Sequence, residues 1–217
     1  MVEEALIKRL KDSLGAVKKP CRKKYVKYMI ASNFYVDGNI FIKRYDIALS
    51  SDYLGNTNYR SKMVVDLLMS IECSLKSLLI TTSNDEVSAK EAYKKARKCG
   101  HNLDKLAKLV INQSKYKIRI PSSNSSVFVE LHELGVFARY SFEIWSIKIK
   151  QKHLFCDNLV ERTIENTYWC NRLRDEAIKW NILASNRLSA LRKHTILSGK
   201  PLLNARKEVD DFVNDLK

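Results

Sequence analysis

Apolar residues recur at helical spacing along nearly the whole chain. Only three prolines and six glycines interrupt 217 residues, so the sequence predicts an all-α protein. The stretch 17 to 38 is basic and aromatic, with a turn expected at Asp37-Gly38, and a short strand there is an open alternative. The expected helices cover residues 2 to 15, 39 to 54, 59 to 81, 86 to 99, 102 to 113, 125 to 145, 156 to 198 and 201 to 216.

The segment 61 to 80 is apolar around almost its whole circumference, which is typical of the central helix of a bundle. Glu72 and Lys76 interrupt it one helical turn apart, so they share a face. A charged side chain that is buried without a partner is costly, so each is expected to find one inside the fold. His101 and Arg139 are the candidate partners.

The sequence predicts helix ends at two places, near residue 100 and near residue 200. Gly100 suits the position that closes one helix, and Asn102 suits the N-cap of the next. Ser198-Gly199 is expected to end the long helix in the same way, and Pro201 to open the last helix at its first turn.

The length allows one sizeable core with appendages. We therefore expect three parts: a basic N-terminal extension (1–38), a helical bundle (39–198) and a C-terminal helix (199–217). The acidic start of the chain and the charges inside its longest apolar stretch predict no export signal and no membrane span. Five cysteines without a C-x-x-C pair predict reduced thiols and a cytoplasmic location.

Basic residues exceed acidic ones by 39 to 24, which favours polyanionic partners. The excess gathers in 18–27, with six cations and no acid, and in 105–129, with five and none. These clusters either bind nucleic acid or form solvated faces. No metal or cofactor is expected, because His153 and Cys156 have no second pair of ligands. The candidate ligands of nucleic acid in the first cluster are Lys18, Lys19, Arg22, Lys23 and Lys24.

Four segments in this order resemble the HEPN superfamily, the small helical bundles of prokaryotic toxins, defence proteins and nucleotidyltransferase partners. They are FIKRYDIALSSDYL (41–54), SIECSLKSLL (70–79), GHNLDKLAKL (100–109) and ARYSF (138–142). The resemblance covers about residues 39 to 198. It implies an up-and-down helical bundle, a homodimer and a role in microbial defence or a toxin-antitoxin system. The helical extensions expected at the N- and C-terminal ends lie outside the resemblance.

Many HEPN proteins are metal-independent ribonucleases with an Arg-x4–6-His motif. Arg187 and His194 match that spacing and lie near the same face of a helix. The resemblance implies that the histidine acts as general base or acid on the ribose 2′-hydroxyl, while the arginine stabilises the phosphorane. However, Leu188 stands where the family usually has a polar residue, and no histidine follows Arg139 within the required window.

The leading interpretation is therefore an RNA- or nucleotide-binding protein whose basic cleft contains Lys76, His101, Arg139 and Tyr140. An endoribonuclease is the first alternative, and a module that docks an acidic protein partner is the second. Product analysis separates an enzyme from a binder, and salt dependence separates nucleic-acid binding from an apolar interface. If Arg187 and His194 both point into a shared basic groove, the non-catalytic interpretation fails; if they point into solvent on separate surfaces, the ribonuclease alternative fails.

Overall fold

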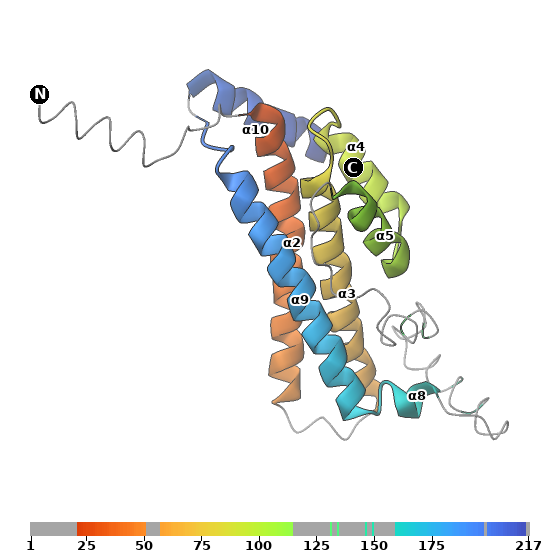
Figure 1. Cartoon of the computed structure of the whole chain (residues 1–217). Coiled ribbons are helices and arrows are strands. Elements are labelled where there is room, and N and C mark those ends of the chain that lie inside the picture. Colours follow the sequence, from red (N-terminus) through yellow and green to blue (C-terminus); the bar gives the residue numbers. More distant parts are fainter. Residues whose placement is uncertain are drawn as a thin grey trace, which may run out of the picture.

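The computed structural model describes residues 21–50, 57–114, 159–197 and 199–215, and the single positions 131, 134, 146 and 149. All regular structure in these ranges is helical, which confirms the predicted all-α class. Figure 1 shows the arrangement of the helices. They are α2 (Arg22–Leu49), α3 (Thr57–Thr82), α4 (Ala89–Lys98), α5 (Leu103–Gln113), α8 (Leu159–Arg162), α9 (Thr167–Arg192) and α10 (Gly199–Asn214).

Helix α3 is the centre of the described fold and contacts α2, α4, α5 and α9 (Figure 1). Leu67, Ile71 and Leu75 are fully buried, and they belong to a cluster that also includes Trp169 and Trp180 of α9. An apolar surface on every side allows a helix to be covered from several directions at once. The predicted central helix is thus confirmed, and both tryptophans are core residues.

Helices α2 and α9 run antiparallel, as polar contacts at both ends show. The Cys21 backbone N–H, just before α2, donates to the His194 carbonyl, just after α9, at 3.1 Å. At the other end of α2, the Arg174 guanidinium donates to both carboxylate oxygens of Asp46, at 2.7 and 3.2 Å. Two-point contact of this kind fixes orientation as well as distance.

The expected helix start at residue 39 and the expected turn at Asp37-Gly38 are both wrong, because α2 runs unbroken from Arg22 to Leu49. Gly38 is buried inside this helix, where a Cβ atom would lie 3.1 Å from both Asn181 Nδ2 and Ser74 Oγ. Glycine is there for close approach of three helices, not for a turn. The same continuity rules out the strand alternative for residues 22–38 and places the expected limit of the N-terminal extension inside a helix.

The predicted helix ends around Gly100 are confirmed. Helix α4 ends at Lys98, and Gly100 adopts a φ of +57°, the left-handed conformation that favours glycine. The Asn102 side chain then accepts a hydrogen bond from the Lys105 N–H at 2.8 Å and caps α5. His101 is consequently held in a tight, defined turn between two short helices.

The long helix predicted over 156 to 198 is shorter in the structure. Asn166 accepts a hydrogen bond from the Trp169 N–H at 3.0 Å, so α9 begins at Thr167 after the separate short helix α8, and it ends at Arg192. The end expected at Ser198-Gly199 is wrong, because Gly199 opens α10. Pro201 lies in the first turn of α10, as predicted.

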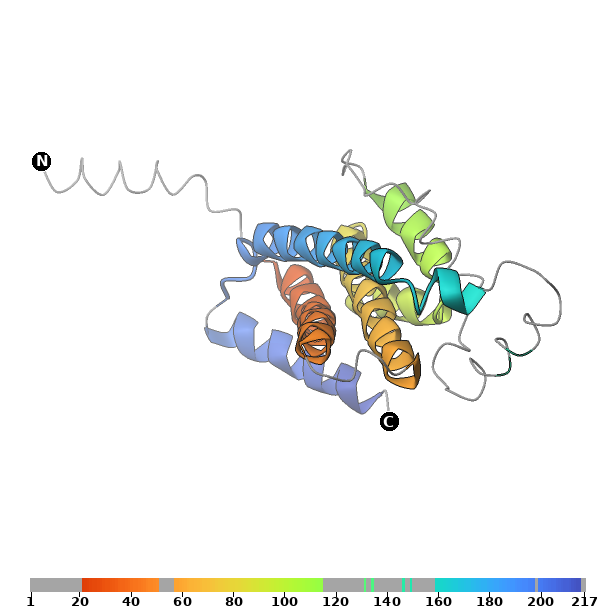
Figure 2. The ribbon, with the colours of Figure 1, turned by 90° about the horizontal axis from the view of Figure 1, so that it is seen from below.

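Helix α10 packs on α2, on the side away from α9 (Figure 2). Its Phe212 is buried in a second apolar cluster with Val26 and Ile30 of α2. In the described parts of the chain, no helix is long and apolar enough to cross a membrane. The helices predicted over 2 to 15 and 125 to 145 lie outside the described residues, apart from the single positions 131 and 134.

Candidate functional site

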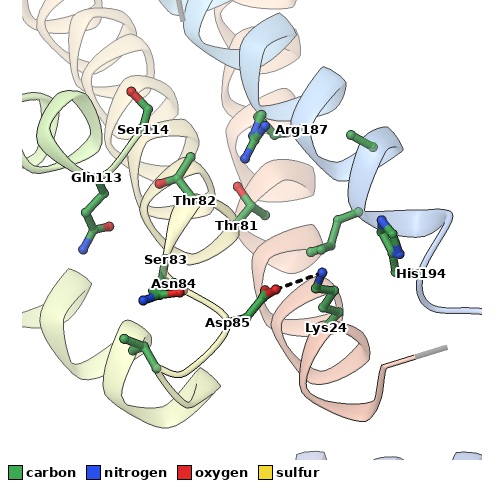
Figure 3. A pocket seen from close by; sticks show the side chains of 13 residues that line it. Lys24, Thr81, Thr82, Ser83, Asn84, Asp85, Gln113, Ser114, Arg187 and His194 are labelled. Atoms are coloured by element: carbon green, nitrogen blue, oxygen red, sulfur yellow. Dashed lines mark ion pairs between the residues drawn. The ribbon is translucent and has the colours of Figure 1, made fainter. Parts of the chain in front are cut away.

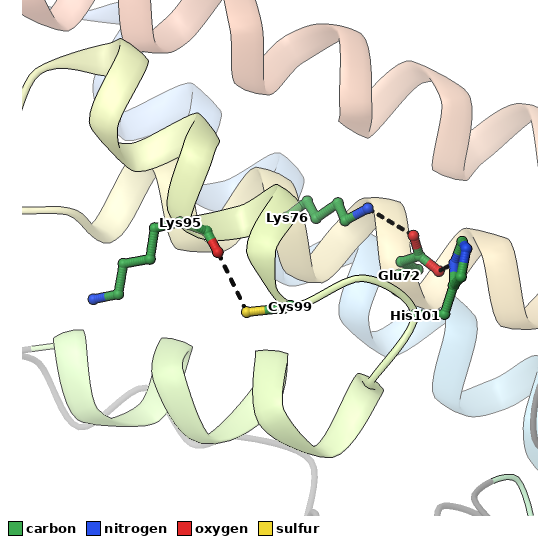
Figure 4. A network of polar contacts seen from close by, with 5 residues as sticks. All are labelled: Glu72, Lys76, Lys95, Cys99 and His101. Carbon is green, nitrogen blue, oxygen red and sulfur yellow. Dashed lines mark hydrogen bonds and ion pairs between the residues drawn. The ribbon is translucent and has the colours of Figure 1, made fainter.

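A buried carboxylate network lies where α3 meets the turn between α4 and α5 (Figure 4). Glu72 is 2% exposed, and its two carboxylate oxygens contact Lys76 Nζ and His101 Nδ1, each at 2.7 Å. Each carboxylate oxygen therefore has a partner, the Lys76 ammonium for one and the His101 imidazole for the other. This confirms the prediction that buried Glu72 pairs inside the fold and that His101 is one of its partners; Arg139, the other candidate, lies outside the described residues.

The network joins three parts of the fold. Lys76 Nζ also lies 6.0 Å from the centroid of the Phe34 ring, which belongs to α2. Lys76 is largely buried, whereas the His101 side chain is 42% exposed. The negative charge of Glu72 is thus compensated within the protein, and the arrangement holds the α4–α5 turn against the central helix. The binding roles expected for Lys76 and His101 remain predictions.

A second polar site is a cavity of about 510 Å³ (Figure 3). It lies among the start of α2, the C-terminal ends of α3 and α5, and the last turns of α9. We call it the polar cavity. The described residues that line it are Lys24, Thr81, Thr82, Ser83, Asn84, Asp85, Val87, Gln113, Ser114, Arg187, Ala190, Leu191 and His194.

Arg187 and His194 both line the polar cavity, together with Lys24. Two helical turns separate them, and Ala190 and Leu191 form the wall between them. The hydrogen bond from the Cys21 backbone N–H to the His194 carbonyl holds this end of α9 against α2. The structure therefore brings both ribonuclease candidates to one cavity and not to separate surfaces, which counts against a purely non-catalytic interpretation.

The Glu72 network and the polar cavity are separate sites. Glu72, Lys76 and His101 are absent from the lining of the cavity. This agrees with the expectation that Lys76 and His101 lie together and that Arg187 lies elsewhere. The expected cleft that also contains Arg139 and Tyr140 is not tested, because both residues lie outside the described ranges.

The basic cluster of residues 18–27 is partly paired in the structure. Arg22 Nε lies 2.7 Å from Glu208 Oε2, and Lys24 Nζ lies 3.1 Å from Asp85 Oδ2. The acidic partners come from distant parts of the chain, so the local excess of cations overstates the free positive charge. Lys23 is exposed, and Lys18 and Lys19 lie outside the described residues.

Lys27 does not line the polar cavity but binds the turn that forms one of its walls. Its side chain is 2% exposed, and Nζ donates to the carbonyls of Asn84 at 2.7 Å and Ser83 at 3.4 Å. Burial lowers the pKa of this lysine. Because its ammonium lies beside the carbonyl end of α3, it compensates the negative pole of that helix and fixes the turn that follows.

The electrostatic balance of the polar cavity favours an anion. Among the described residues that line it, two permanent cations, Lys24 and Arg187, accompany one carboxylate, Asp85, and Lys27 compensates the end of α3. His194 adds positive charge whenever it is protonated. A phosphate group fits this balance and can accept several of the hydrogen bonds that an arginine side chain offers.

Sequence reasoning missed the hydroxyl-rich wall formed by Thr81, Thr82 and Ser83, which are 8–9% exposed. The available signal was the polar run TTSND (81–85), which directly follows the apolar central helix. Such a run is typical of an ordinary turn, and only the fold places it opposite Arg187.

Comparison with protein-family models, with curated proteins and with solved structures finds no match to this chain. Within the described ranges, no group of three histidine, cysteine, aspartate or glutamate side chains is placed to hold a metal ion.

Proposed function

We propose that this protein binds RNA or a nucleotide in the polar cavity and that Arg187 and Lys24 hold the phosphate. The observation that carries the proposal is the meeting of Lys24, Arg187 and His194, from two distant segments, in one polar cavity. Its volume of about 510 Å³ is within the usual range for small-molecule sites. The resemblance to the HEPN superfamily supports an RNA-directed role in a cytoplasmic defence or toxin-antitoxin system, with a homodimer as the expected assembly.

Phosphate suits these particular cations. The guanidinium of Arg187 can donate two parallel hydrogen bonds to phosphate oxygens, whereas Lys24 acts as a point charge. Asp85 keeps the Lys24 ammonium at the cavity and leaves it able to contact a second anion. The net charge of +15 adds long-range attraction for a polyanion.

The test is equilibrium binding of a fluorescently labelled single-stranded RNA to the wild type and to Arg187→Gln. We expect the variant to lose about tenfold or more in affinity, which corresponds to a hydrogen bond with a charged group. Arg172→Gln is the matched control, because Arg172 is also on α9 but packs over the Tyr168 ring and does not line the cavity. Equal losses in both variants, or in neither, would contradict the proposal.

Metal-independent endoribonuclease activity is the second candidate, and the shared cavity of Arg187 and His194 favours it. In this reaction the ribose 2′-oxygen attacks phosphorus and the bond to the 5′-oxygen breaks. The 2′-hydroxyl loses a proton and the leaving 5′-oxygen gains one, with His194 in one of these roles and water in the other. Arg187 stabilises the charge that develops on the phosphorane, and the products are a 2′,3′-cyclic phosphate and a 5′-hydroxyl.

Expression of the wild type beside His194→Ala, followed by gel analysis of total RNA, separates the two candidates. The substitution spares the contact between α2 and α9, because that contact uses the backbone carbonyl of His194. RNA loss in cells that express the wild type alone supports the enzyme. The purified wild type should then also cleave RNA in EDTA and leave cyclic phosphate ends. Intact RNA with retained binding supports the binder.

A further inference from the structure

The hydroxyl groups along one wall of the polar cavity all donate their hydrogen to the protein itself. Thr81 Oγ1 donates to the Ser77 and Leu78 carbonyls at 3.0 and 3.1 Å, and Thr82 Oγ1 donates to the Leu78 carbonyl at 2.8 Å. Ser83 Oγ donates to the Ile80 carbonyl at 2.8 Å, and Ser114 Oγ donates to the Ile111 carbonyl at 3.0 Å.

A hydroxyl has one hydrogen to donate and two lone pairs that accept. Because each hydrogen is used within the helix, a ligand in the cavity meets these oxygens as acceptors. The Asp85 carboxylate is also an acceptor. Figure 3 shows Thr82, Ser83 and Ser114 on the side of α3 and α5, with Arg187 and His194 across from them on α9.

The polar cavity is therefore divided in its hydrogen-bonding character. Lys24 and Arg187 supply donors and the hydroxyl wall supplies acceptors, while the side-chain amides of Asn84 and Gln113 carry both kinds of group. A ligand that satisfies both sides carries an anion at one end and N–H donors at the other. A nucleotide whose base bears an exocyclic amino group has both features, since an amino group donates two hydrogen bonds and a phosphate accepts them.

We infer that the polar cavity holds one nucleotide with an amino-bearing base, its amino group on the hydroxyl wall and its phosphate at Arg187 and Lys24. This inference rests on the proposed function and narrows its ligand. A base that carries hydrogen or a carbonyl oxygen in place of the amino group leaves acceptors on the wall without a donor. The affinity for a nucleotide should therefore depend on the presence of the amino group and not on the size of the base.

The test compares nucleotides that differ at the amino group. Binding constants are measured for GMP against IMP, and for AMP against purine riboside 5′-monophosphate, by calorimetry with the full chain. We expect the amino-bearing member of at least one pair to bind about threefold to tenfold more tightly, as one net hydrogen bond allows. Equal or tighter binding of both analogues that lack the amino group would overturn the inference.

Valine substitutions test whether the hydroxyl wall causes the difference in affinity between the two nucleotides of a pair. Thr81→Val and Thr82→Val each replace a hydroxyl by a methyl group of similar size, and we expect at least one to reduce the binding ratio of the discriminating pair toward one. Thr195→Val is the matched control, since Thr195 Oγ1 also donates to a helix carbonyl, that of Arg192 at 2.8 Å, but lies outside the cavity lining. An unchanged ratio in both cavity variants would contradict the assignment.

The possible failures are distinguishable. Equal affinity within both nucleotide pairs, with RNA binding still dependent on Arg187, overturns the inference and leaves the proposed function standing. RNA binding without any binding of mononucleotides also overturns it, because the cavity would then not hold a single nucleotide. Absence of binding to both RNA and nucleotides overturns the inference and the proposed function together.

Discussion

Removing the carboxylate of Glu72 should destabilise the fold strongly. In Glu72→Leu the two contacts at 2.7 Å, with Lys76 Nζ and His101 Nδ1, are lost together. Leucine fills most of the space that glutamate occupies, so the main effect is electrostatic. The Lys76 ammonium, only 13% exposed, is left buried without its partner.

The expected loss of stability depends on whether Lys76 and His101 can form other hydrogen bonds after Glu72 is replaced. Breaking a buried ion pair costs about 3 to 5 kcal/mol. His101 is 42% exposed and can form hydrogen bonds with water instead, whereas Lys76 cannot do so without moving. We therefore expect a loss near the lower end, about 3 kcal/mol in the free energy of unfolding, or a fall in Tm of about 6 to 12 °C.

Urea unfolding followed by tryptophan fluorescence and far-UV circular dichroism measures this loss. The double variant Glu72→Leu with Lys76→Met removes both charges, and we expect it to recover most of the stability, because a buried pair replaced by apolar residues is often close to neutral. The matched control is the exposed pair on α5, Asp104 with Lys108 at 2.6 Å, for which Lys108→Met should cost about 0 to 1 kcal/mol.

Two results would refute this reasoning. A loss below about 1 kcal/mol in Glu72→Leu would mean that the pair behaves like a surface contact. Strictly additive effects of Glu72→Leu and Lys76→Met would mean that the two side chains are not energetically coupled.

Three further substitutions test other parts of the account by urea unfolding. Gly38→Ala places a Cβ 3.1 Å from Asn181 Nδ2 and 3.2 Å from the backbone oxygen of Ser70, so these neighbours must shift by a few tenths of an ångström. We expect the overpacking, about 1 to 3 kcal/mol, to outweigh the gain in helix propensity, about 1 kcal/mol, so that the net cost is up to about 2 kcal/mol. Lys27→Met leaves the carbonyls of residues 83 and 84 without their ammonium donor, at a cost of about 1 to 3 kcal/mol. Burial raises the Asp66 pKa, so stability should fall as pH rises from 3.8 through the raised value, and Asp66→Asn should flatten that fall.

Each of these substitutions has a control or a contradicting result. Asn39→Ala, one residue along α2, should not destabilise as Gly38→Ala does, and equal losses would argue against close packing at Gly38. A Lys27→Met protein as stable as the wild type would show that its hydrogen bonds to the turn contribute nothing. If Asp66→Asn and the wild type lose stability equally over the same pH window, another group is responsible.

Local sequence patterns predicted the parts of the fold that local chemistry determines. The apolar circumference of residues 61–80 identified the central helix, and Gly100 and Asn102 marked the ends of its two small neighbours. The cost of burying Glu72 was enough to predict that it pairs within the fold.

The remaining features depend on contacts between distant segments. Asp37-Gly38 resembles a turn locally, and only the crossing of α2 with α3 and α9 explains a glycine inside a helix. Arg22 pairs with Glu208 at 2.7 Å, although no acid is near it in the sequence. The polar cavity likewise combines residues from α2, α3, α5 and α9, so no single motif could have revealed it.

The most direct test of the central claim is to locate bound RNA on the protein by ultraviolet crosslinking, followed by mass spectrometry of the crosslinked peptides. The account predicts crosslinks within residues 81–85, 113–114 or 187–194, which line the polar cavity, and their loss in Arg187→Gln. Crosslinks that leave these segments unmodified and persist in Arg187→Gln would contradict it.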